Sequence, residues 1–417
     1  MDKSFFDNFR MGDYQRENFD TFLDKIKFSY KVPSIHIAGS NGKGSTATYL
    51  AAGYSGSGYK VGLFHSPFLK SPNEMISIDG KTISDDDFMR IYNSYKKEID
   101  KYDLSAFEIQ AFVAFTYFQE QKCDIAIIEC GMGGLIDATN VFTPVLSIIT
   151  TISLEHTDYL GFSISEIAEQ KAGIIKPEVP VLIGNDMTED ALTVISNTAK
   201  ANKSTICYLG HYVNQEYHED GYTFEYGRYG KIRIKSVGLY SINDCVMALE
   251  AMTVLDNQFP IKIEEAVKAI GEVFMPCRME VYSKKPLIIL DGAHNPEAMK
   301  KLCDVSLSRV IGLRPIHVIF CCFRDKNLGS MLSYLGEITD DLTLTTFNHP
   351  RARTVDEYFL FLGDYQFEEN AKELIQKKIQ EFPNDAFIIT GSLAFAAHVR
   401  ELLNNGEINY EVGPVQE

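Results

Sequence analysis

The most distinctive chemistry in this sequence lies in a glycine-rich run with a single lysine, directly after a short apolar stretch. The run reads I-H-I-A-G-S-N-G-K-G-S-T over Ile35–Thr46. Its glycines permit backbone conformations that other residues avoid and allow close approach to an anion, while N–H groups at a helix start attract phosphates. Lys43 would pair with the β- and γ-phosphates of a nucleotide, and the hydroxyl of Ser45 or Thr46 could face the nucleotide or its metal. We assign ATP binding to Gly39, Ser40, Asn41, Gly42, Lys43, Gly44, Ser45 and Thr46.

The spacing of this run differs from that of the common phosphate loop, G-x-x-x-x-G-K-[ST]. The loop is shorter, and an additional glycine, Gly44, separates the lysine from the hydroxyl residue. This difference argues against an ordinary GTPase or kinase loop. The alternative is a strand-to-helix turn that binds nothing, although a turn alone does not need a lysine beside three glycines.

A second reactive group, the carboxylate of Glu129, ends another apolar run. The stretch Asp124–Glu129 has the pattern of a buried strand, which places Glu129 at the carboxyl end of a parallel sheet. Open α/β folds bind their ligands at that edge. Because a carboxylate is a hard oxygen ligand, Glu129 is a candidate for holding Mg²⁺.

Short β-branched runs alternate with helical patterns along the chain, which is typical of parallel sheets with crossover helices. In the first part we expect strands at Ser34–Ala38, Asp124–Glu129, Val145–Thr150 and Val179–Ile183. The expected helices are about Lys43–Gly53, Ser163–Ala172 and Ile242–Leu255, and Tyr222–Ile234 has the alternation of an antiparallel hairpin. A second α/β series is expected at Leu287–Leu290, His317–Phe320, Leu342–Thr346 and Ala386–Thr390.

The length of the chain, 417 residues, exceeds the size at which one hydrophobic core usually keeps growing. We therefore expect two domains, residues 1–281 with the nucleotide loop and residues 282–417 with the second α/β series. The short polar segment Tyr282–Pro286 is the expected link and hinge between them.

Composition excludes several classes of protein. The formal charge of -17 opposes nucleic-acid binding, while short-range N–H groups and one lysine can still hold nucleotide phosphates. The eight cysteines form no C-x-x-C pair and are expected to be buried free thiols. Since Met1–Arg10 lacks a long apolar region and about 18 uncharged apolar residues never run together, we expect a cytoplasmic protein that contacts no membrane.

Further motifs extend the pattern along the chain. They are H-S-P-F-L (His65–Leu69), F-E (Phe107 and Glu108), E-C-G-M-G-G-L-I-D-A-T-N (Glu129–Asn140), E-H-T-D-Y-L-G (Glu155–Gly161), K-A-G-I-I-K (Lys171–Lys176), P-C-R-M-E (Pro276–Glu280), D-G-A-H-N-P (Asp291–Pro296) and G-S (Gly391 and Ser392). With these motifs the loop is similar to that of the Mur ligase superfamily, and nearly the whole chain resembles the folylpolyglutamate synthase/dihydrofolate synthase family.

The resemblance implies an α/β fold with a P-loop-containing, mostly parallel sheet domain of the Mur ligase central-domain type and a smaller Rossmann-like C-terminal domain. It also implies an ATP- and Mg²⁺-dependent ligase that activates a carboxylate as an acyl phosphate and joins it to glutamate. The implied catalytic residues are Lys43, Glu129, His156 and Lys171, and the implied magnesium residues are Ser66, Glu129 and His156. Taken without the resemblance, Ser66 could be a turn residue and His156 an exposed loop histidine.

For Lys171, the resemblance implies carbamylation to N6-carboxylysine, which would help to hold a second magnesium. That modification needs a neutral amine and hence a perturbed lysine environment. The other interpretation is an ordinary solvated lysine on a helix.

Other positions would bind the substrates. The implied ATP contacts are Asp244, or its neighbour Asn243, with Arg278 at phosphate and Asp291 at the nucleoside. The implied pterin or pteroate contacts are Ser105, Phe107, Glu108 and Asp137, and His294 would contact the nucleotide or the incoming amino acid. Each of these positions also has a structural alternative. Arg278 and Asp291 could form an ion pair, and His294 could lie in a helix-capping loop. The residues implied to contact the pterin could instead belong to a helix start and a strand-end turn.

The sequence departs from the family where polar residues have become apolar. Phe68, Met75 and Leu135 replace a histidine and two arginines, and Tyr240 with Asp244 replaces a histidine and an asparagine of the family pattern. Losing two arginines weakens recognition of a polyanionic folate. We expect a monomer that adds glutamate to folate and could also convert dihydropteroate to dihydrofolate. The alternatives are a related ligase for another acid and a nucleotide-binding regulator without ligase activity.

Overall fold

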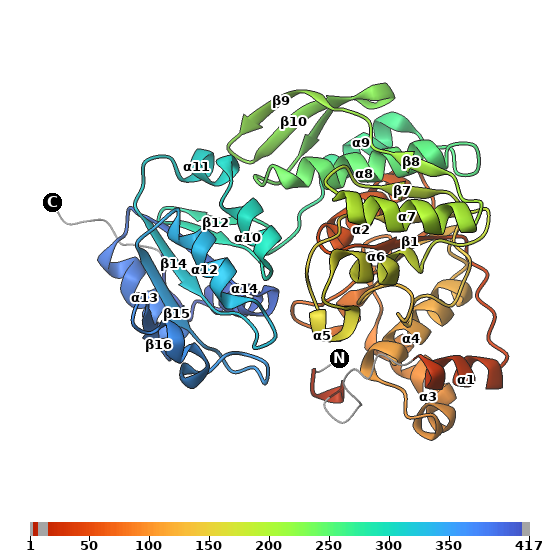
Figure 1. Cartoon of the computed structure of the whole chain (residues 1–417), viewed down its shortest axis with the longest axis horizontal. Helices are drawn as coiled ribbons and strands as arrows, with labels where there is room; N and C mark the ends of the chain where they lie inside the picture. The colour runs from red at the N-terminus through yellow and green to blue at the C-terminus, as the bar shows by residue number, and fades with distance from the viewer. Residues whose placement is uncertain (1–2, 7–15, 411–417) are drawn as a thin grey trace. The chain divides into compact units, whose positions relative to one another are not determined.

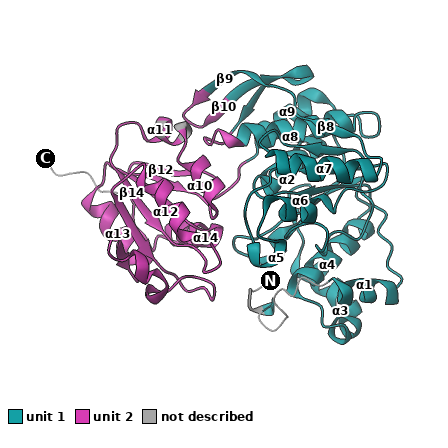
Figure 2. Ribbon diagram, viewed as in Figure 1, with its two compact units in different colours: residues 1–216, 223–234, 241–273 teal, residues 217–222, 235–240, 274–417 magenta. Residues whose placement is uncertain are grey.

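The chain folds into two compact units, which the computed structural model describes over residues 3–6 and 16–410. Residues 1–216, 223–234 and 241–273 belong to the first unit, and residues 217–222, 235–240 and 274–417 belong to the second (Figure 2). Most of the N-terminal segment that lacks an apolar region, Met1–Arg10, lies outside the described residues. The described residues include four 3-10 helices, at Lys3–Phe6, Pro72–Met75, Gly227–Tyr229 and Val355–Phe361.

An eight-stranded sheet forms the centre of the first unit (Figure 1). Its strands are β1 (Ser34–Ala38), β2 (Val61–Phe64), β3 (Ile76–Ile78), β4 (Lys81–Thr82), β5 (Ile125–Glu129), β6 (Leu146–Ile149), β7 (Val181–Ile183) and β8 (Ile206–Tyr208). Their order is β4-β3-β2-β5-β1-β6-β7-β8, and all neighbours pair in parallel except β2 with β3 and β3 with β4. The mostly parallel sheet that we expected from the sequence is confirmed.

Helices pack on this sheet and on one another. They are α1 (Glu17–Lys25), α2 (Lys43–Gly56), α3 (Asp85–Lys101), α4 (Ala106–Glu120), α5 (Thr157–Leu160), α6 (Ile164–Ala172), α7 (Glu189–Ala201), α8 (Tyr240–Val254) and α9 (Ile263–Gly271). α2 is longer than expected, because Gly53 does not end it. A Cβ at Gly53 would lie 2.8 Å from Sδ of Met252 on α8, so the glycine serves close helix packing.

The register of the central strands brings the candidate site together. Ile37 on β1 pairs with Glu129 at the end of β5, and Ala38 pairs with Ile149 at the end of β6. Because parallel strands end at the same edge of a sheet, the glycine-rich loop, Glu129 and the segment after β6 are neighbours.

A small antiparallel sheet has the order β11-β10-β9. Its strands are β9 (Val213–His218), β10 (Gly221–Tyr226) and β11 (Gly230–Ile234). The hairpin expected over Tyr222–Ile234 is therefore present, and its sequence neighbours Tyr217–Tyr222 belong to the second unit.

The second unit holds a six-stranded sheet with the order β12-β13-β17-β14-β15-β16. Its strands are β12 (Glu280–Lys284), β13 (Leu287–Leu290), β14 (Ile316–Phe320), β15 (Asp341–Thr345), β16 (Gln366–Glu368) and β17 (Ala386–Thr390), and its helices are α10 (Pro296–Leu302), α11 (Val305–Ile311), α12 (Leu328–Gly336), α13 (Ala371–Glu381) and α14 (Leu393–Asn404). Only β12 is antiparallel to its neighbour; the remaining pairs are parallel.

The segment Tyr282–Pro286, expected to link two domains, lies inside this sheet. It forms the end of β12 and the turn into β13, whereas the main stretch of the second unit already begins at Phe274. The segment resembles a polar link because β12 is an edge strand and, after buried Glu280, the rest of its side chains are half-buried or exposed. The domain limits 1–281 and 282–417, and a hinge near residue 282, stay predictions.

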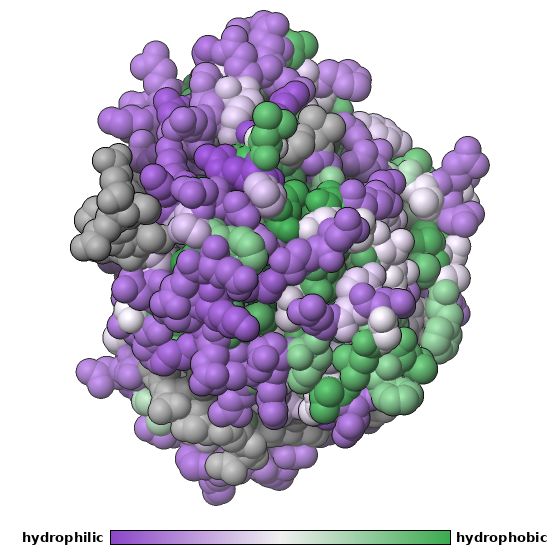
Figure 3. All heavy atoms as spheres, turned by 90° about the vertical axis from the view of Figure 1, so that its left-hand side faces the viewer, coloured by the Kyte–Doolittle hydropathy of each residue, from purple (hydrophilic) through white to green (hydrophobic). Residues whose placement is uncertain are grey.

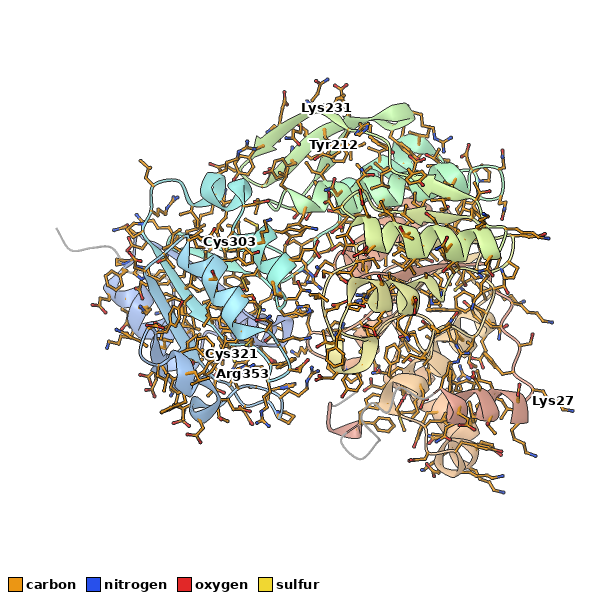
Figure 4. The ribbon with its side chains drawn as sticks, viewed as in Figure 1. Lys27, Tyr212, Lys231, Cys303, Cys321 and Arg353 are labelled. Carbon is orange, nitrogen blue, oxygen red and sulfur yellow. The ribbon has the colours of Figure 1, made fainter. Side chains whose placement is uncertain are left out.

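The face drawn in Figure 3 is mostly hydrophilic, with apolar side chains gathered in part of the view. The eight cysteines are free and six of them are buried, whereas Cys207 and Cys303 are half-buried and differ from the expectation. The two labelled in Figure 4, Cys303 and Cys321, follow α10 and β14. Among the described residues, no helix is both long and apolar enough to cross a membrane.

Candidate active site

The glycine-rich loop joins β1 to α2 through two strained positions that only glycine tolerates well. Gly39 has φ of 150° and Gly42, at the N-cap of α2, has φ of 83°. A Cβ at Gly39 would lie 1.9 Å from Oγ1 of Thr150, and one at Gly42 would lie 2.4 Å from Oδ1 of Asp244. The loop can therefore lie close to the sheet edge and to α8 only because these residues lack side chains.

Hydrogen bonds attach the loop to the segment that follows β6. Ser40 N–H donates to the Thr151 carbonyl over 2.8 Å, and Asn41 N–H donates to the Thr151 hydroxyl over 2.9 Å. The Thr150 hydroxyl in turn donates to the Asn41 carbonyl over 2.6 Å. This attachment holds the loop in place before any ligand is bound, which is what efficient anion recognition requires.

Lys43 begins α2 and folds back over the loop. Its Nζ donates to the carbonyls of Gly39 and Ser40 over 2.8 and 3.2 Å. The ammonium is thus held against the loop that leads into the helix start, whose N–H groups would hold a phosphate. Of the two hydroxyl residues, Thr46 is fully buried while Ser45 keeps 6% exposure, so Ser45 is better placed to reach a ligand.

Glu129 lies against the first turn of α2. Its Oε2 accepts a hydrogen bond from Ser66 N–H over 3.0 Å, and a Cβ at Gly44 would lie 3.3 Å from the same oxygen. The predicted proximity of Glu129, Ser66 and the phosphate loop is therefore present in the structure. Magnesium in nucleotide sites is commonly held by one or two carboxylates with phosphate oxygens and water, and this arrangement fits that donor set.

His156 occupies the N-cap of the short helix α5 in a left-handed conformation, with φ of 47°. The structure does not bring it into a protein-only metal cluster with Glu129, because no three His, Cys, Asp or Glu side chains within residues 3–6 and 16–410 converge in that way. Its role as a magnesium residue stays a prediction.

Lys171 is not a solvated lysine, since its side chain is 1% exposed and forms an ion pair with buried Glu155 over 2.8 Å. Burial lowers the pKa of Lys171, and Glu155 opposes that change. Burial alone would raise the pKa of Glu155. The charges of Lys171, Lys43 and His156 outweigh this effect and hold the pKa of Glu155 well below its usual range. Glu155 is a site residue that our sequence reasoning missed, because only the fold brings it to Lys171.

The expected pterin contacts Ser105 and Glu108 form the N-terminal cap of α4. Glu108 N–H donates to Oγ of Ser105 over 3.3 Å, and Ser105 N–H donates to Oε2 of Glu108 over 2.7 Å. Both residues are buried, and the capping box accounts for their types, while their predicted contact with substrate stays untested. Phe107 packs against the backbone at Gly131, where a Cβ would lie 2.4 Å from its ring.

Asp137 is buried in the loop that follows Glu129. Its carboxylate accepts from Met132 N–H over 2.8 Å, from Thr139 N–H over 2.9 Å and from the Thr139 hydroxyl over 2.5 Å. Burial raises the pKa of Asp137, and these hydrogen bonds oppose the rise. The structure thus gives Asp137 a role in shaping this loop, and its predicted contact with substrate stays untested.

Asp244 and Asn243 lie on different sides of the start of α8. Asp244 faces Gly42 of the phosphate loop, whereas Asn243 lines a cavity of about 570 Å³. The cavity is also lined by Asn185, His211, Asn214 and Tyr212, the last of which Figure 4 labels. Its lining is rich in amide groups, which can both donate and accept hydrogen bonds.

In the second unit, Asp291 and His294 follow the end of β13. Asp291 is buried and accepts from the N–H groups of Met279 and Ala293 over 2.7 and 2.8 Å. Burial raises the pKa of Asp291, while nearby Arg278 opposes the rise. His294 Nδ1 lies 2.8 Å from the Gly292 carbonyl, and the cap of α10 is made by the next residue, Asn295. Capping therefore does not account for His294.

Comparisons with known proteins agree with this geometry. Residues 37–252 match the family model of the Mur ligase middle domain, and residues 277–393 match that of the Mur ligase glutamate ligase domain. The chain is 32% identical over 395 residues to a dihydrofolate synthase/folylpolyglutamate synthase of Bacillus subtilis, an alignment that covers 89% of this chain and 91% of that protein. It is 30% identical over 389 residues to a folylpolyglutamate synthase of Lacticaseibacillus casei, covering 89% and 90% of the two chains.

Solved structures show the same fold. A complex of Mycobacterium tuberculosis folylpolyglutamate synthase with ADP has a TM-score of 0.87 at 26% identity and covers 96% of this chain and 97% of that chain. A folylpolyglutamate synthase complex with the ATP analogue AMPPCP and folate has a TM-score of 0.84 at 27% identity, covering 96% and 98%. The chain therefore belongs to the Mur ligase family, as a relative of the folylpolyglutamate and dihydrofolate synthases.

Proposed function

We propose that this chain is an ATP-dependent ligase that adds L-glutamate to the carboxylate of a folate through an acyl phosphate. The observation that carries the proposal is the convergence of the glycine-rich loop and Glu129 at one sheet edge, with the carboxylate against the first turn of α2. A phosphate-binding helix start beside a metal-binding carboxylate is the arrangement that phosphoryl transfer from ATP requires.

A free carboxylate is a poor electrophile, and its phosphorylation removes that barrier. The acceptor carboxylate attacks the γ-phosphoryl group, while Lys43 and the N–H groups of the helix start hold the charge that builds on the transferring oxygens. Glu129 and Ser66 would hold Mg²⁺, which when bound neutralises charge on the phosphate oxygens. The amino group of glutamate then attacks the acyl phosphate, and the products are an amide, ADP and phosphate.

Burial of Lys171 supports its proposed conversion to a carbamate. The pKa of its amine is lowered, and only the neutral amine can react with carbon dioxide. The carbamate would extend from Lys171 as an additional carboxylate for a second Mg²⁺. Native mass measurement at neutral pH of protein incubated with bicarbonate tests this step, because the carbamate adds the mass of carbon dioxide to the whole protein. The variant Lys171→Met should not gain this mass.

Nucleotide and acceptor would use different parts of the molecule. We place the adenine of ATP in the cavity lined by Asn243, with Asp244 beside the phosphate loop. Contacts of Arg278 and Asp291 with ATP, and of His294 with the nucleotide or glutamate, stay proposals that rest on the family resemblance. The acceptor would lie near Phe107 and the loop that Asp137 shapes. Conversion of dihydropteroate to dihydrofolate would use the same site, because the reaction again joins glutamate to a carboxylate.

A second candidate function is ligation of glutamate to another acid. It is favoured by the apolar residues at positions where the related family carries cations, and one of them, Leu135, is 49% exposed on the loop after Glu129. An exposed leucine cannot pair with a polyanionic substrate as an arginine would. A panel of pterin and other carboxylates with ATP, Mg²⁺ and isotope-labelled glutamate, analysed by mass, separates the two functions and also reveals a protein without ligase activity.

The substitution Lys43→Ala tests the catalytic assignment. It should lower glutamate-dependent ADP release by roughly 100-fold or more, because it removes a cation from the transferring phosphoryl group. The matched control is Lys231→Ala, since the Lys231 side chain is 61% exposed on β11 (labelled in Figure 4). Turnover by Lys43→Ala equal to that of the control would contradict the assigned role.

The substitution Glu129→Gln tests the metal assignment. It keeps an acceptor oxygen for Ser66 N–H but removes the charge, so the Mg²⁺ concentration for half-maximal activity should rise. An unchanged magnesium titration would exclude Glu129 as a ligand.

We also propose that the enzyme acts as a cytoplasmic monomer. Light scattering of the purified protein would test its oligomeric state, and fractionation of its source cells would test its location.

A further inference from the structure

A buried hydrogen-bonded group lies beneath the phosphate loop, and the reaction described above does not use it. His36 on β1 is fully buried, and its Nε2 lies 2.8 Å from Oγ1 of Thr139 and 3.1 Å from Sγ of Cys130. The Thr139 hydroxyl donates to Oδ1 of Asp137 over 2.5 Å. These contacts join residues that are about one hundred positions apart in the chain.

The direction of these hydrogen bonds follows from the chemistry of the groups. The Asp137 carboxylate only accepts hydrogen bonds, and the Thr139 hydroxyl uses its single proton to donate to this carboxylate. The oxygen of Thr139 can then only accept from His36, so the imidazole carries its proton on Nε2. Consistently, Nδ1 of His36 is buried without a hydrogen-bond partner among the described residues. The chain of donors runs from His36 through Thr139 to Asp137.

Asp137 fixes the shape of the loop made of residues 131–140, which touches two parts of the candidate site. At its start, Gly131 packs against the ring of Phe107. In its middle, Leu135 N–H donates to the Gln170 carbonyl over 2.6 Å, and a Cβ at Gly134 would lie 2.9 Å from the carbonyl oxygen of Lys171. The loop therefore links the acceptor side of the site to the helix that carries Lys171.

The same loop begins two residues after Glu129, so a change in its shape would also move the carboxylate that faces α2. Its end is held by Asn140, whose Nδ2 donates to the carbonyls of Leu135 and Gly173, both over 3.2 Å. β1 is the strand that leads into the phosphate loop, and its residue His36 contacts the Thr139 side chain at the end of the loop 131–140.

We propose that His36 and Thr139 are positioning residues of the ligation reaction, which hold the loop 131–140 in the shape that sets Phe107, Glu129 and Lys171 relative to the phosphate loop. Neither residue touches substrate. Their effect should appear mainly in kcat/KM for the carboxylate acceptor, because the N–H groups and Lys43 that bind ATP belong to the phosphate loop itself. The proposal rests on the ligase function proposed above.

The test compares Thr139→Val with Thr139→Ser. Valine keeps the shape of threonine but removes the hydroxyl, which leaves the Asp137 carboxylate and His36 without their shared partner, whereas serine keeps the hydroxyl. For Thr139→Val we expect kcat/KM for the acceptor to fall roughly 10- to 100-fold. The dissociation constant of a fluorescent ATP analogue should stay within about twofold, and Thr139→Ser should recover most of the loss.

The matched control is Thr116→Val on α4, because the Thr116 hydroxyl is buried and has no hydrogen-bond partner among the described residues. It should keep kcat/KM for the acceptor near the wild-type value. The proposal would be overturned if Thr139→Val had the same kcat/KM for the acceptor as this control. It would also be overturned if Thr139→Ser had no higher kcat/KM than Thr139→Val.

If Thr139→Val cannot be purified in folded form, His36 provides the second comparison. In His36→Gln the side-chain amide can donate a hydrogen bond to the Thr139 oxygen as Nε2 does, so this variant should stay active. In His36→Leu no donor is present, so kcat/KM for the acceptor should fall. Equal activity of these two variants would overturn the proposal. A wild-type protein that turns over no acceptor would instead refute the proposed function, and the positioning role with it.

Discussion

Acid should destabilise this protein through His36. The imidazole is fully buried on β1, and burial lowers its pKa from 6.5 to about 3, with smaller contributions from the positive charges of Lys176 and Arg16. In the unfolded chain the same group has its ordinary pKa. Between these two values the unfolded state binds a proton that the folded state does not bind, so stability falls as the pH decreases.

The size of this effect follows from the two pKa values. Each pH unit below 6.5 costs about 1.4 kcal/mol of unfolding free energy per proton, until the folded pKa is reached near pH 3. Between pH 7 and pH 5 the loss due to His36 is about 2 kcal/mol, because protonation of the unfolded state only begins near its pKa. The complete loss near pH 3 is about 5 kcal/mol.

The assay is urea unfolding at pH 7 and pH 5 of the wild type and of His36→Gln, which keeps a donor for Thr139 but does not titrate. The wild type should lose about 2 kcal/mol more than the variant between the two pH values, whatever the other groups contribute. His211→Gln, at an exposed histidine, controls for the removal of an imidazole and should behave like the wild type. Equal losses in the wild type and in His36→Gln would refute a neutral, buried His36.

Three further substitutions test the packing and charges of the site. Gly39→Ala would force a Cβ to within 1.9 Å of Oγ1 of Thr150. Thermal unfolding should show that the free energy of unfolding falls by roughly 2–4 kcal/mol, and an ATP analogue should bind more weakly. A variant as stable as the wild type would contradict the close approach. In protein kept free of bicarbonate, where Lys171 is an unmodified amine, Glu155→Gln leaves the buried ammonium without its ionic partner and should cost roughly 3–5 kcal/mol. The double variant Glu155→Gln/Lys171→Met should recover part of that loss but remain inactive, and a double variant no more stable than the single one would argue against an ion pair. Leu135→Arg should lower KM for a polyglutamylated acceptor if a folate binds beside the loop after Glu129, and an unchanged KM would place the substrate elsewhere.

Local sequence features determined much of this protein. β-branched runs predicted the central strands, and the turn from β1 to α2 followed from Gly39, Gly42 and Lys43, because strand formation, positive φ and helix starts depend on neighbouring residues. The position of Glu129 at a strand end could be predicted for the same reason.

Only the tertiary structure decided which distant groups meet. His36 reaches Thr139 because β5 pairs with β1 in the sheet, and strand order is not a property of any local segment. Glu155 reaches Lys171 because the segment after β6 turns back onto α6. The same holds for Gly53, whose place inside α2 reflects close packing against α8 and not a helix end. Patterns along the chain report on burial and backbone shape, whereas the chemistry of this site depends on side chains that the fold brings together from separate segments.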